Sequence, residues 1–255
     1  MLKQITGCKM IIAETLLLRS ALWTESDALA THGGHREQAN RWADQEAKER
    51  ELSDLETGFP QFIGFNPAQG GASPTPKIHL DYSPAGARMH IRDYHPRLRA
   101  ATAEIIHAED ALLAGGKSLP EYYRESSGPR WALFSIWRPL KTVRRDPLAL
   151  GDRHTFGAAD YVPVKVKTPC LGQPGVMETR AVEAYVARYS KGHKWFWIDE
   201  QRPEEVLVIG LFDSHAEREG GKTAGGTLHS SVDLLGTEGE EARESLELRC
   251  ICIWD

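Results

Sequence analysis

Apolar and polar residues follow one pattern up to about residue 57 and another beyond it. Ile11–Trp23 is apolar and periodic, and Gln38–Leu55 is rich in Glu, Ala, Arg and Gln, which favour helix on exposed faces. The apolar run Met10–Leu18 loosely imitates a signal peptide, but Glu14 breaks it and no clean small-residue cleavage site follows. We therefore expect a helical N-terminal segment that begins with an amphipathic helix.

From Gly58 onward, prolines and glycines become frequent and short β-type runs are separated by turn signals. Two helices are expected between the strands, at Pro96–Leu113 and Glu178–Tyr189. The predicted strands are Gln61–Phe65, Lys77–Tyr82, Trp131–Pro139, Tyr161–Lys167, Lys194–Ile198, Glu205–Phe212, Gly226–Val232 and Ser245–Trp254.

Many short strands after a helical section favour a mainly β fold with flanking helices. The core is expected to be a double-stranded β-helix of the jelly-roll or cupin type. No internal repeat or low-complexity linker is visible, so residues 1–255 are expected to form a single domain. In this prediction a helical segment, residues 1–57, packs on a jelly-roll core, residues 58–255.

The last predicted strand has two different faces. Its even positions from Leu246 to Trp254 are all apolar. Its odd positions begin with four polar residues, Arg243, Ser245, Glu247 and Arg249. Because side chains alternate along a strand, one face would pack on a core while the other lines a polar cavity. A solvated edge strand would show the same pattern, and this alternative stays open.

The bulk composition excludes some classes of protein. A net charge of −5 spread over 255 residues argues against a nucleic-acid binder. No stretch approaches the roughly 20 apolar residues that span a bilayer. The four cysteines, Cys8, Cys170, Cys250 and Cys252, show neither a disulfide framework nor a zinc-site spacing. We expect reduced thiols in a cytoplasmic protein that binds a small-molecule substrate and is a monomer or homodimer.

The triplet His79-Leu80-Asp81 has the spacing of a metal site. In an extended strand residues i and i+2 point the same way, so the imidazole and the carboxylate would converge. One more His completes a 2-His-1-carboxylate triad, which leaves three positions open on Fe(II). We prefer His229 because it precedes the strand that carries Arg243. His193 is its main rival, and His90, His95, His107 and His154 are weaker ones.

Several blocks of the chain resemble the hydroxylase/desaturase family of fungi and bacteria, which includes gibberellin-desaturase-like proteins and a component of cephamycin methoxylation. The resemblance covers about residues 55–255, in the family's order. The matching blocks are Ile136–Leu140, Asp146–Leu150 with Asp152, His193–Trp197, Glu204–Leu207, Phe212–Ser214, His229 and Arg243–Arg249.

This resemblance implies an Fe(II)/2-oxoglutarate-dependent dioxygenase of specialised metabolism, with O2 as a further co-substrate. An unactivated C–H bond would undergo hydroxylation, desaturation or oxidative cyclisation, with succinate and CO2 as co-products. In such enzymes an Arg and a hydroxyl bind the far carboxylate of the oxo-acid, which implies that role for Arg243 and Ser245. Arg138 either binds a carboxylate as well or pairs with Asp146 or Asp152.

Five further residues are candidates for binding the substrate: Tyr82, His90, Trp137, Trp195 and Arg249. The N-terminal segment has no counterpart in the family, so the resemblance does not identify the substrate. Two other functions are kept as alternatives. One is a cupin-like metal-dependent hydrolase or isomerase that does not use 2-oxoglutarate. The other is a non-catalytic binding partner of a tailoring enzyme.

Overall fold

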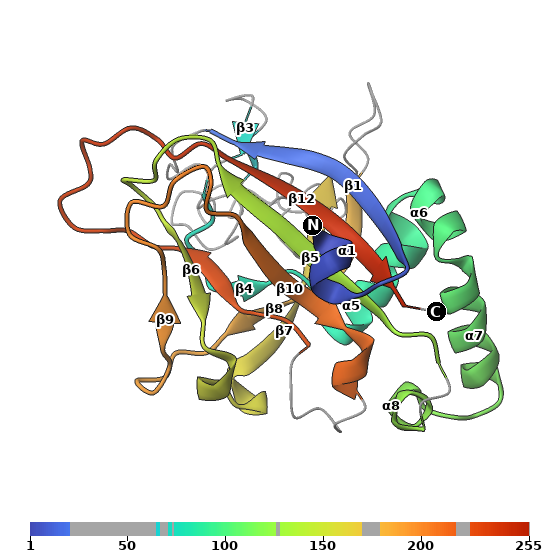
Figure 1. Ribbon diagram of the computed structural model, residues 1–255. Helices are drawn as coiled ribbons and strands as arrows, with labels where there is room; N and C mark the ends of the chain where they lie inside the picture. Colours follow the sequence, from blue (N-terminus) through green and yellow to red (C-terminus); the bar gives the residue numbers. More distant parts are fainter. Residues whose placement is uncertain are drawn as a thin grey trace, which may run out of the picture.

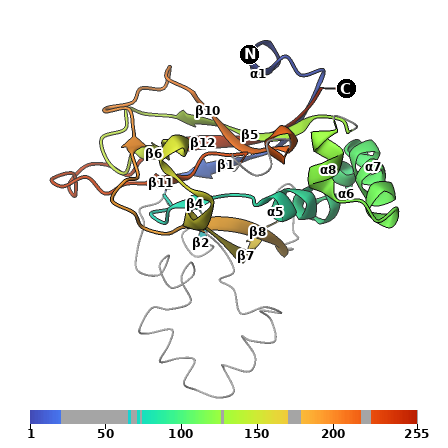
Figure 2. The same ribbon diagram turned by 90° about the horizontal axis from the view of Figure 1, so that it is seen from below.

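The computed structural model describes residues 1–20, 65–66, 71–72, 74–125, 128–169, 179–217 and 225–254. Within these ranges two β-sheets lie in layers, and helices gather at one end of them (Figures 1 and 2). The first sheet contains β1 (Met10–Arg19), β2 (Phe65–Asn66), β3 (Gly71–Ala72), β5 (Trp131–Pro139), β10 (Leu207–Asp213) and β12 (Ser245–Ile253). Their order is β10-β5-β12-β1-β3-β2.

The second sheet runs in the order β7-β8-β4-β11-β6-β9. Its strands are β4 (His79–Leu80), β6 (Leu148–Gly151), β7 (Tyr161–Pro169), β8 (Thr179–Ala187), β9 (Trp195–Phe196) and β11 (His229–Ser231). Apart from the β1–β3 pair, the strand pairs of both sheets are antiparallel. This arrangement agrees with the mainly β fold that the sequence predicts.

The helices lie mostly between β4 and β5 in the chain. They are α5 (Pro84–Met89), the π-helix η2 (His90–Tyr94), α6 (Pro96–Ala101), α7 (Ala103–Ala114) and α8 (Leu119–Arg124). Short 3-10 turns are η3 (Arg153–Thr155), η4 (Ala158–Asp160) and η5 (Ser214–Glu217). The N-terminal helix α1 (Leu2–Thr6) lies apart from them, near the C-terminal end (Figure 1). None of the described helices has the length and apolar character to cross a membrane.

The main hydrophobic core joins the helices to the first sheet. Buried residues of the helices, such as Ile91 and Ile105, share one cluster with Trp131, Phe212 and Ile251 of the sheet. The other face of β12 has a separate small cluster, in which Cys250 and Cys252 pack with Leu2 and Cys8. The two faces of β12 are therefore both used, one toward the inside of the fold and one toward α1.

Helix α5 begins directly after the His79–Asp81 triplet and fixes its position. The hydroxyl of Ser83 accepts a hydrogen bond from the Gly86 amide (3.0 Å) and donates one to Glu183 of β8 (2.5 Å). A Cβ atom on Gly86 would lie only 1.7 Å from the backbone oxygen of Glu183. Only glycine therefore lets α5 approach β8 this closely.

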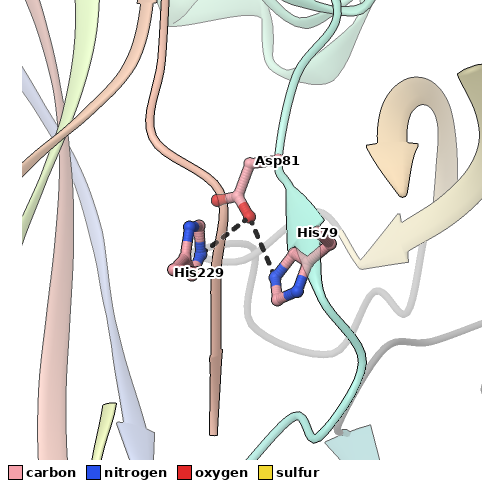
Figure 3. A group of neighbouring side chains, drawn as sticks. All are labelled: His79, Asp81 and His229. Carbon is pink, nitrogen blue, oxygen red and sulfur yellow. Dashed lines mark ion pairs between the residues drawn. The ribbon is translucent and has the colours of Figure 1, made fainter. Parts of the chain in front are cut away.

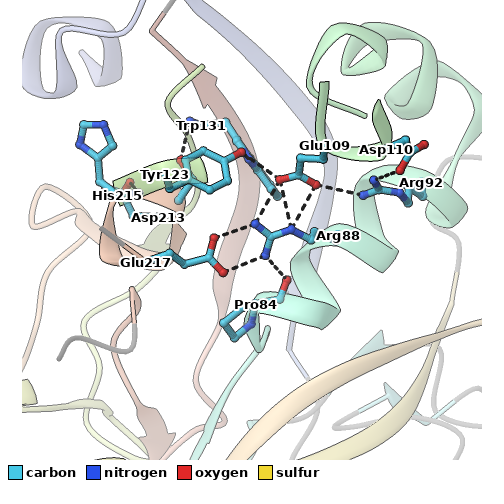
Figure 4. A network of polar contacts seen from close by, with 11 residues as sticks. Pro84, Arg88, Arg92, Glu109, Asp110, Tyr123, Trp131, Asp213, His215 and Glu217 are labelled. Atoms are coloured by element: carbon cyan, nitrogen blue, oxygen red, sulfur yellow. Dashed lines mark hydrogen bonds and ion pairs between the residues drawn. The ribbon is translucent and has the colours of Figure 1, made fainter. Parts of the chain in front are cut away.

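A buried network of charges ties the helices to one end of the first sheet, where β5 begins and β10 ends (Figure 4). Glu109 of α7 is completely buried and accepts hydrogen bonds from Arg88 of α5 and from the hydroxyl of Tyr123. Arg88 also binds Glu217 in η5, with 2.7 Å between Nη2 and Oε2. The Trp131 indole at the start of β5 donates to Tyr123 (3.1 Å). Buried charges paired in this way restrain α5 relative to the sheet.

The predicted amphipathic helix over Met10–Leu18 is wrong, because this stretch is strand β1, paired with β12. The register shifts between Ala13 and Leu16, which is a β-bulge. Apolar positions before and after a bulge fall out of phase, so the sequence lacks the period of two that marks a strand. The predicted helix over Gln38–Leu55 lies outside the described residues, as does Cys170.

The second predicted helix, Glu178–Tyr189, is also wrong, because Thr179–Ala187 forms β8. Val182 and Ala184 are buried against Val166 of β7, while Glu183 between them points to the other face. This alternation of buried and outward-facing residues favours a strand here, although Ala and Glu on their own favour a helix. The predicted Pro96–Leu113 helix is present as α6 and α7, and Trp131–Pro139 has the predicted bounds.

Candidate metal centre

Two histidines lie opposite each other where β4 and β11 pair. His79 and His229 are direct partners in this antiparallel pair, although 150 residues separate them in the chain. Their ring centroids are 4.5 Å apart (Figure 3). Both side chains are buried, with 8% and 9% of their residue surfaces exposed. The pairing of two short strands thus brings together the two imidazoles that the sequence singled out.

Asp81 follows β4 directly and points between the two rings (Figure 3). Its Oδ1 atom lies 3.4 Å from Nε2 of His79 and 3.6 Å from Nε2 of His229. One ligand atom from each of the three residues lies within 4.8 Å of the others. Among the described residues this is the group of His, Cys, Asp or Glu side chains that could hold a metal ion.

The far nitrogen of each imidazole is fixed by the backbone. Nδ1 of His79 lies 2.7 Å from the carbonyl oxygen of Lys77, and Nδ1 of His229 lies 2.9 Å from that of Thr227. A carbonyl oxygen only accepts, so each Nδ1 carries the proton and each Nε2 has a lone pair toward Asp81 when the ring is neutral. This is the arrangement found in histidines that bind metals. Burial, followed by the charge of His79, lowers the pKa of His229 and favours its neutral form.

The second oxygen of Asp81 faces a cation. Oδ2 lies 2.9 Å from Nη2 of Arg249 on β12. Burial alone would raise the pKa of the Asp81 carboxyl, but Arg249 and the two histidines hold it well below its ordinary value. Asp81 is therefore a carboxylate, the form that binds a metal ion.

A cavity lined by residues of both sheets opens beside these three residues. The lining residues are Arg19, Thr75, His79, Asp81, Ser135, Trp137, Leu148, Ile209, His229, Ser230, Ser231, Arg243 and Glu247. The polar odd positions of the last strand face this cavity through Arg243 and Glu247, as the sequence predicts, and the solvated-edge alternative does not hold.

Arg243 is a buried cation without a carboxylate partner among the described residues. Only 4% of it is exposed, and Nη1 donates to the backbone oxygen of Asp146 (2.5 Å). Its Cζ lies 5.2 Å from the centroid of the Trp137 ring, and Nε has no hydrogen-bond partner in this part of the chain. Burial, and then the neighbouring Arg19, lower the pKa of Arg243 to about 9. An anion entering the cavity would relieve this unfavourable burial.

The hydroxyl of Ser245 is also buried and without a partner among the described residues. Ser245 is the first residue of β12, and Arg243 lies two residues before this strand. Ser245 itself is not among the residues that line the cavity. The two residues predicted to bind the oxo-acid therefore each carry a buried polar atom without a hydrogen-bond partner among the described residues, and Arg243 also lines the cavity.

The structure separates the predicted substrate residues into two groups. Trp137 lines the cavity, whereas Tyr82, His90 and Arg249 lie behind the triad in a buried polar cluster. Trp195, in β9 of the second sheet, packs against Phe156 and does not line the cavity. These positions argue against substrate contact by the four residues that do not line the cavity, Tyr82, His90, Arg249 and Trp195.

Arg138 does not reach the cavity. It is exposed on the opposite face of β5 from Trp137 and donates to the backbone oxygen of Pro203 (2.9 Å). Adjacent residues of a strand point to opposite faces, so Trp137 and Arg138 could not both line the cavity. The prediction that Arg138 binds a carboxylate of the oxo-acid is therefore a mistake, and pairing with Asp146 or Asp152 is not seen either.

His193, the main rival for the distal ligand, lies elsewhere. Its Nε2 is 3.2 Å from Oδ2 of Asp160, and its ring stacks on Phe156 with centroids 3.9 Å apart. A buried histidine with an acidic partner and an aromatic neighbour has a structural role. His229 is thus the histidine that the fold places beside His79 and Asp81.

Some cavity residues were missed by sequence reasoning. Arg19 stands at the end of β1, the stretch that the sequence pattern assigned to a helix. Thr75, Ser135, Ser230 and Ser231 are small polar residues without a motif of their own. For Arg19, the available signal was the β-branched pair Ile11-Ile12, which favours a strand. No signal in the sequence distinguishes the small residues.

Comparison with known proteins identifies relatives of this chain. The family model described as "YDMC: Oxidoreductase/YMDC permease-like domain" matches residues 43–253. Oxidoreductase chry3 of Gibberella zeae is 37% identical over 99% of this chain and 73% of that protein. The gibberellin cluster GA4 desaturase of Gibberella fujikuroi is 39% identical over 71% of this chain and 51% of that protein. Alpha-ketoglutarate-dependent dioxygenase tstK of Talaromyces stipitatus is 34% identical over 78% and 65%, respectively.

Among solved structures, the iron and alpha-ketoglutarate-dependent endoperoxidase NvfI superposes with a TM-score of 0.57 at 18% identity. The match covers 99% of this chain and 65% of that one. Together with the two antiparallel sheets, this likeness confirms the predicted jelly-roll fold. The chain spans between 51% and 73% of the three relatives' lengths.

Proposed function

This chain belongs to the hydroxylase/desaturase family of oxidoreductases, and on that premise we propose that it is a non-haem Fe(II)/2-oxoglutarate-dependent dioxygenase. Its substrate would be a small molecule of specialised metabolism, oxidised at an unactivated C–H bond. The name of tstK, an alpha-ketoglutarate-dependent dioxygenase, supports the choice of co-substrate. The free buried thiols of Cys8, Cys250 and Cys252 support a reducing compartment, for which we propose the cytoplasm.

One observation carries this proposal. Two imidazoles, each fixed by a backbone carbonyl, direct Nε2 toward one oxygen of a buried carboxylate. Beside them is a cavity lined by Arg243, a buried guanidinium that has no carboxylate partner among the described residues. The donor set of two nitrogens and one oxygen suits Fe(II) and leaves positions open for co-substrates. The same cavity thus offers a place for a metal and a place for an anion.

The chain's own residues would each have a defined task. His79, Asp81 and His229 would hold Fe(II), which with 2-oxoglutarate and O2 supplies the oxidising power, with succinate and CO2 as co-products. Arg243 and Ser245 would bind the far carboxylate of the oxo-acid, since each has a buried donor to offer. Trp137, Leu148 and Ile209 form an apolar wall that would limit the access of water.

The test is the formation of succinate. Wild-type protein incubated with Fe(II), 2-oxoglutarate and air should release succinate, slowly even without its substrate, and the Asp81→Ala variant should release none above background. Iron-loaded wild type that yields no succinate would contradict the proposal. That result would favour a hydrolase or isomerase that uses the same ligands. Such an enzyme would give no role to the Nε of Arg243 and the hydroxyl of Ser245, which have no hydrogen-bond partner among the described residues.

A further inference from the structure

We propose that Arg249 is a positioning residue that holds the Asp81 carboxylate so that a single oxygen, Oδ1, faces the metal. This inference rests on the proposed function and deepens it. The sequence offered Arg249 as a residue that contacts substrate. Its guanidinium instead lies on the far side of Asp81 from the two histidines and does not line the cavity.

The Asp81 carboxylate is divided between two sets of partners. Oδ1 lies 3.4 Å and 3.6 Å from the Nε2 atoms of His79 and His229 (Figure 3). Oδ2 lies 2.9 Å from Nη2 of Arg249. A carboxylate with one oxygen bound to a cation in this way has only the other oxygen to offer to a metal ion.

Arg249 is itself fixed by its neighbours. Its Nε donates to Oε1 of Glu247 (3.2 Å), and its Nη1 donates to the hydroxyl of Tyr82 (3.3 Å). The Cζ atom also lies 5.7 Å from the centroid of the Tyr82 ring. Because the guanidinium is planar and rigid, two such contacts determine where the third nitrogen points. Nη2 is thereby held in an ion pair with Oδ2 of Asp81, at 2.9 Å.

The Tyr82 hydroxyl is supported by a buried pair behind it. His90 lies 3.4 Å from this hydroxyl through Nδ1, and its Nε2 is 2.9 Å from Oε1 of Glu14. Glu14 sits in the β1 bulge, where the register shifts opposite Arg249. The chain Glu14, His90, Tyr82 and Arg249 thus connects the N-terminal strand to Asp81. The charges that face Arg249 are Asp81, Glu247 and Glu14.

The binding mode of Asp81 decides how many positions a metal ion keeps for its co-substrates. Two histidines and one carboxylate oxygen leave three of six positions open. If both carboxylate oxygens bound the ion, only two would remain. By occupying Oδ2, Arg249 would preserve the third position. Lysine could supply the charge but not the two hydrogen bonds, to Glu247 and Tyr82, that hold the charge beside Asp81.

Binding of Co(II) tests the proposal without any turnover, because the absorption spectrum of Co(II) reports its coordination. In Arg249→Gln the Asp81 carboxylate loses its restraint. We expect Co(II) to bind about 10- to 100-fold more weakly, as is typical when the partner of a metal ligand is removed, with an altered spectrum. Arg249→Lys should lie between this variant and wild type. Tyr82→Phe, which loses a single hydroxyl and keeps the ring, should shift affinity and spectrum in the same direction but less.

Arg130→Gln is the matched control. The Arg130 guanidinium likewise pairs with a carboxylate, that of Asp213 (2.7 Å), and lies against an aromatic ring, that of Trp254. None of these three residues belongs to the triad or lines the cavity. Arg130→Gln should leave both the affinity and the spectrum of Co(II) unchanged. An equal effect from Arg130→Gln would overturn the proposal, since it would show a general response to the loss of a paired arginine.

Failure of this inference differs from failure of the proposed function. One outcome is that Arg249→Gln binds Co(II) with wild-type affinity and an unchanged spectrum, while His79→Ala abolishes binding. This outcome would overturn the role of Arg249 and leave the metal site intact. Wild type and His79→Ala that bind Co(II) equally would overturn the metal site itself. If Arg249→Gln fails to fold, Arg249→Lys and Tyr82→Phe test the role of Arg249 by the same criteria.

Discussion

Ser245 is the first residue of β12 and Arg243 lies two residues before it, and each keeps a buried polar atom without a hydrogen-bond partner among the described residues. Buried polar groups are nearly always paired, so two such atoms only two residues apart indicate a site for a ligand. A guanidinium and a hydroxyl together suit a carboxylate, which is the group that we expect to bind here.

Arg243→Met should weaken binding of 2-oxoglutarate to the metal-loaded protein by about 10- to 100-fold, since a hydrogen bond to a charged group contributes about 1.5–3 kcal/mol. Ser245→Ala should weaken it by about 3- to 10-fold, as expected for a weaker donor. Anaerobic titration calorimetry measures both. Arg138→Met is the control, because Arg138 lies exposed on the outer face of β5. If all three variants bind the oxo-acid like wild type, Arg243 and Ser245 are not its site.

The same Arg243→Met variant should not lose stability when no ligand is present. The lowered pKa of Arg243, caused first by burial, indicates that this cation is held at a cost in the folded state. We expect the free energy of unfolding in urea to equal or exceed that of wild type. A loss of more than about 2 kcal/mol would assign Arg243 a structural role through the Asp146 carbonyl instead.

Gly86→Ala should destabilise the protein by about 3 kcal/mol, because the added methyl group collides with the backbone of β8. Helix α5 would have to move, and Asp81 lies just before that helix. Weaker metal binding should therefore accompany the loss of stability. Gly239→Ala is the control, since nothing lies within 4 Å of a Cβ at that position. Urea unfolding that finds the two variants equally stable would contradict this account of the α5–β8 contact.

Alkaline pH should lower stability through the buried thiol of Cys250. Burial, followed by the charges of Glu14 and Cys8, raises the pKa of Cys250 to about 11 from an ordinary 9. Between these values the unfolded chain loses the thiol proton while the folded protein keeps it, so the free energy of unfolding falls as pH rises. This contribution is complete below pH 9 and is lost as pH rises toward 11.

A comparison of wild type with Cys250→Ala isolates this contribution from the other groups that titrate in the alkaline range. Unfolding by urea at a series of pH values from about 7 to about 11 should give a shallower decline for the variant. Parallel curves would show that Cys250 has the same proton affinity in the folded and unfolded chain.

The sequence predicted the strand residues of the site better than their surroundings. His79 and Asp81 converge because of the two-residue period of a strand, which needs no knowledge of the fold. The direct pairing of His79 with His229 joins residues 150 positions apart, and no local pattern specifies that register. The position of His229 before the strand that carries Arg243, together with the family resemblance, supplied this link instead.

The failures have a physical cause in each case. The β1 bulge hides the strand period, so Arg19 was not expected in the cavity. β8 contains residues that favour helix, and pairing with its neighbours overrides their propensity. The sequence indicated Arg249 as a substrate-binding residue, but its side chain pairs with Asp81. The alternation of polar residues along the strand does not specify which partner the side chain reaches.

The most direct test of the metal centre is an anaerobic titration of Fe(II) into wild type, His79→Ala, Asp81→Ala, His229→Ala and His193→Ala. His193 serves as the control because it is a buried histidine paired with Asp160, away from the triad. The account predicts one tightly bound Fe(II) in wild type and His193→Ala, and an affinity about 100-fold lower in each of the three triad variants. Equal binding of Fe(II) by all five proteins would contradict it.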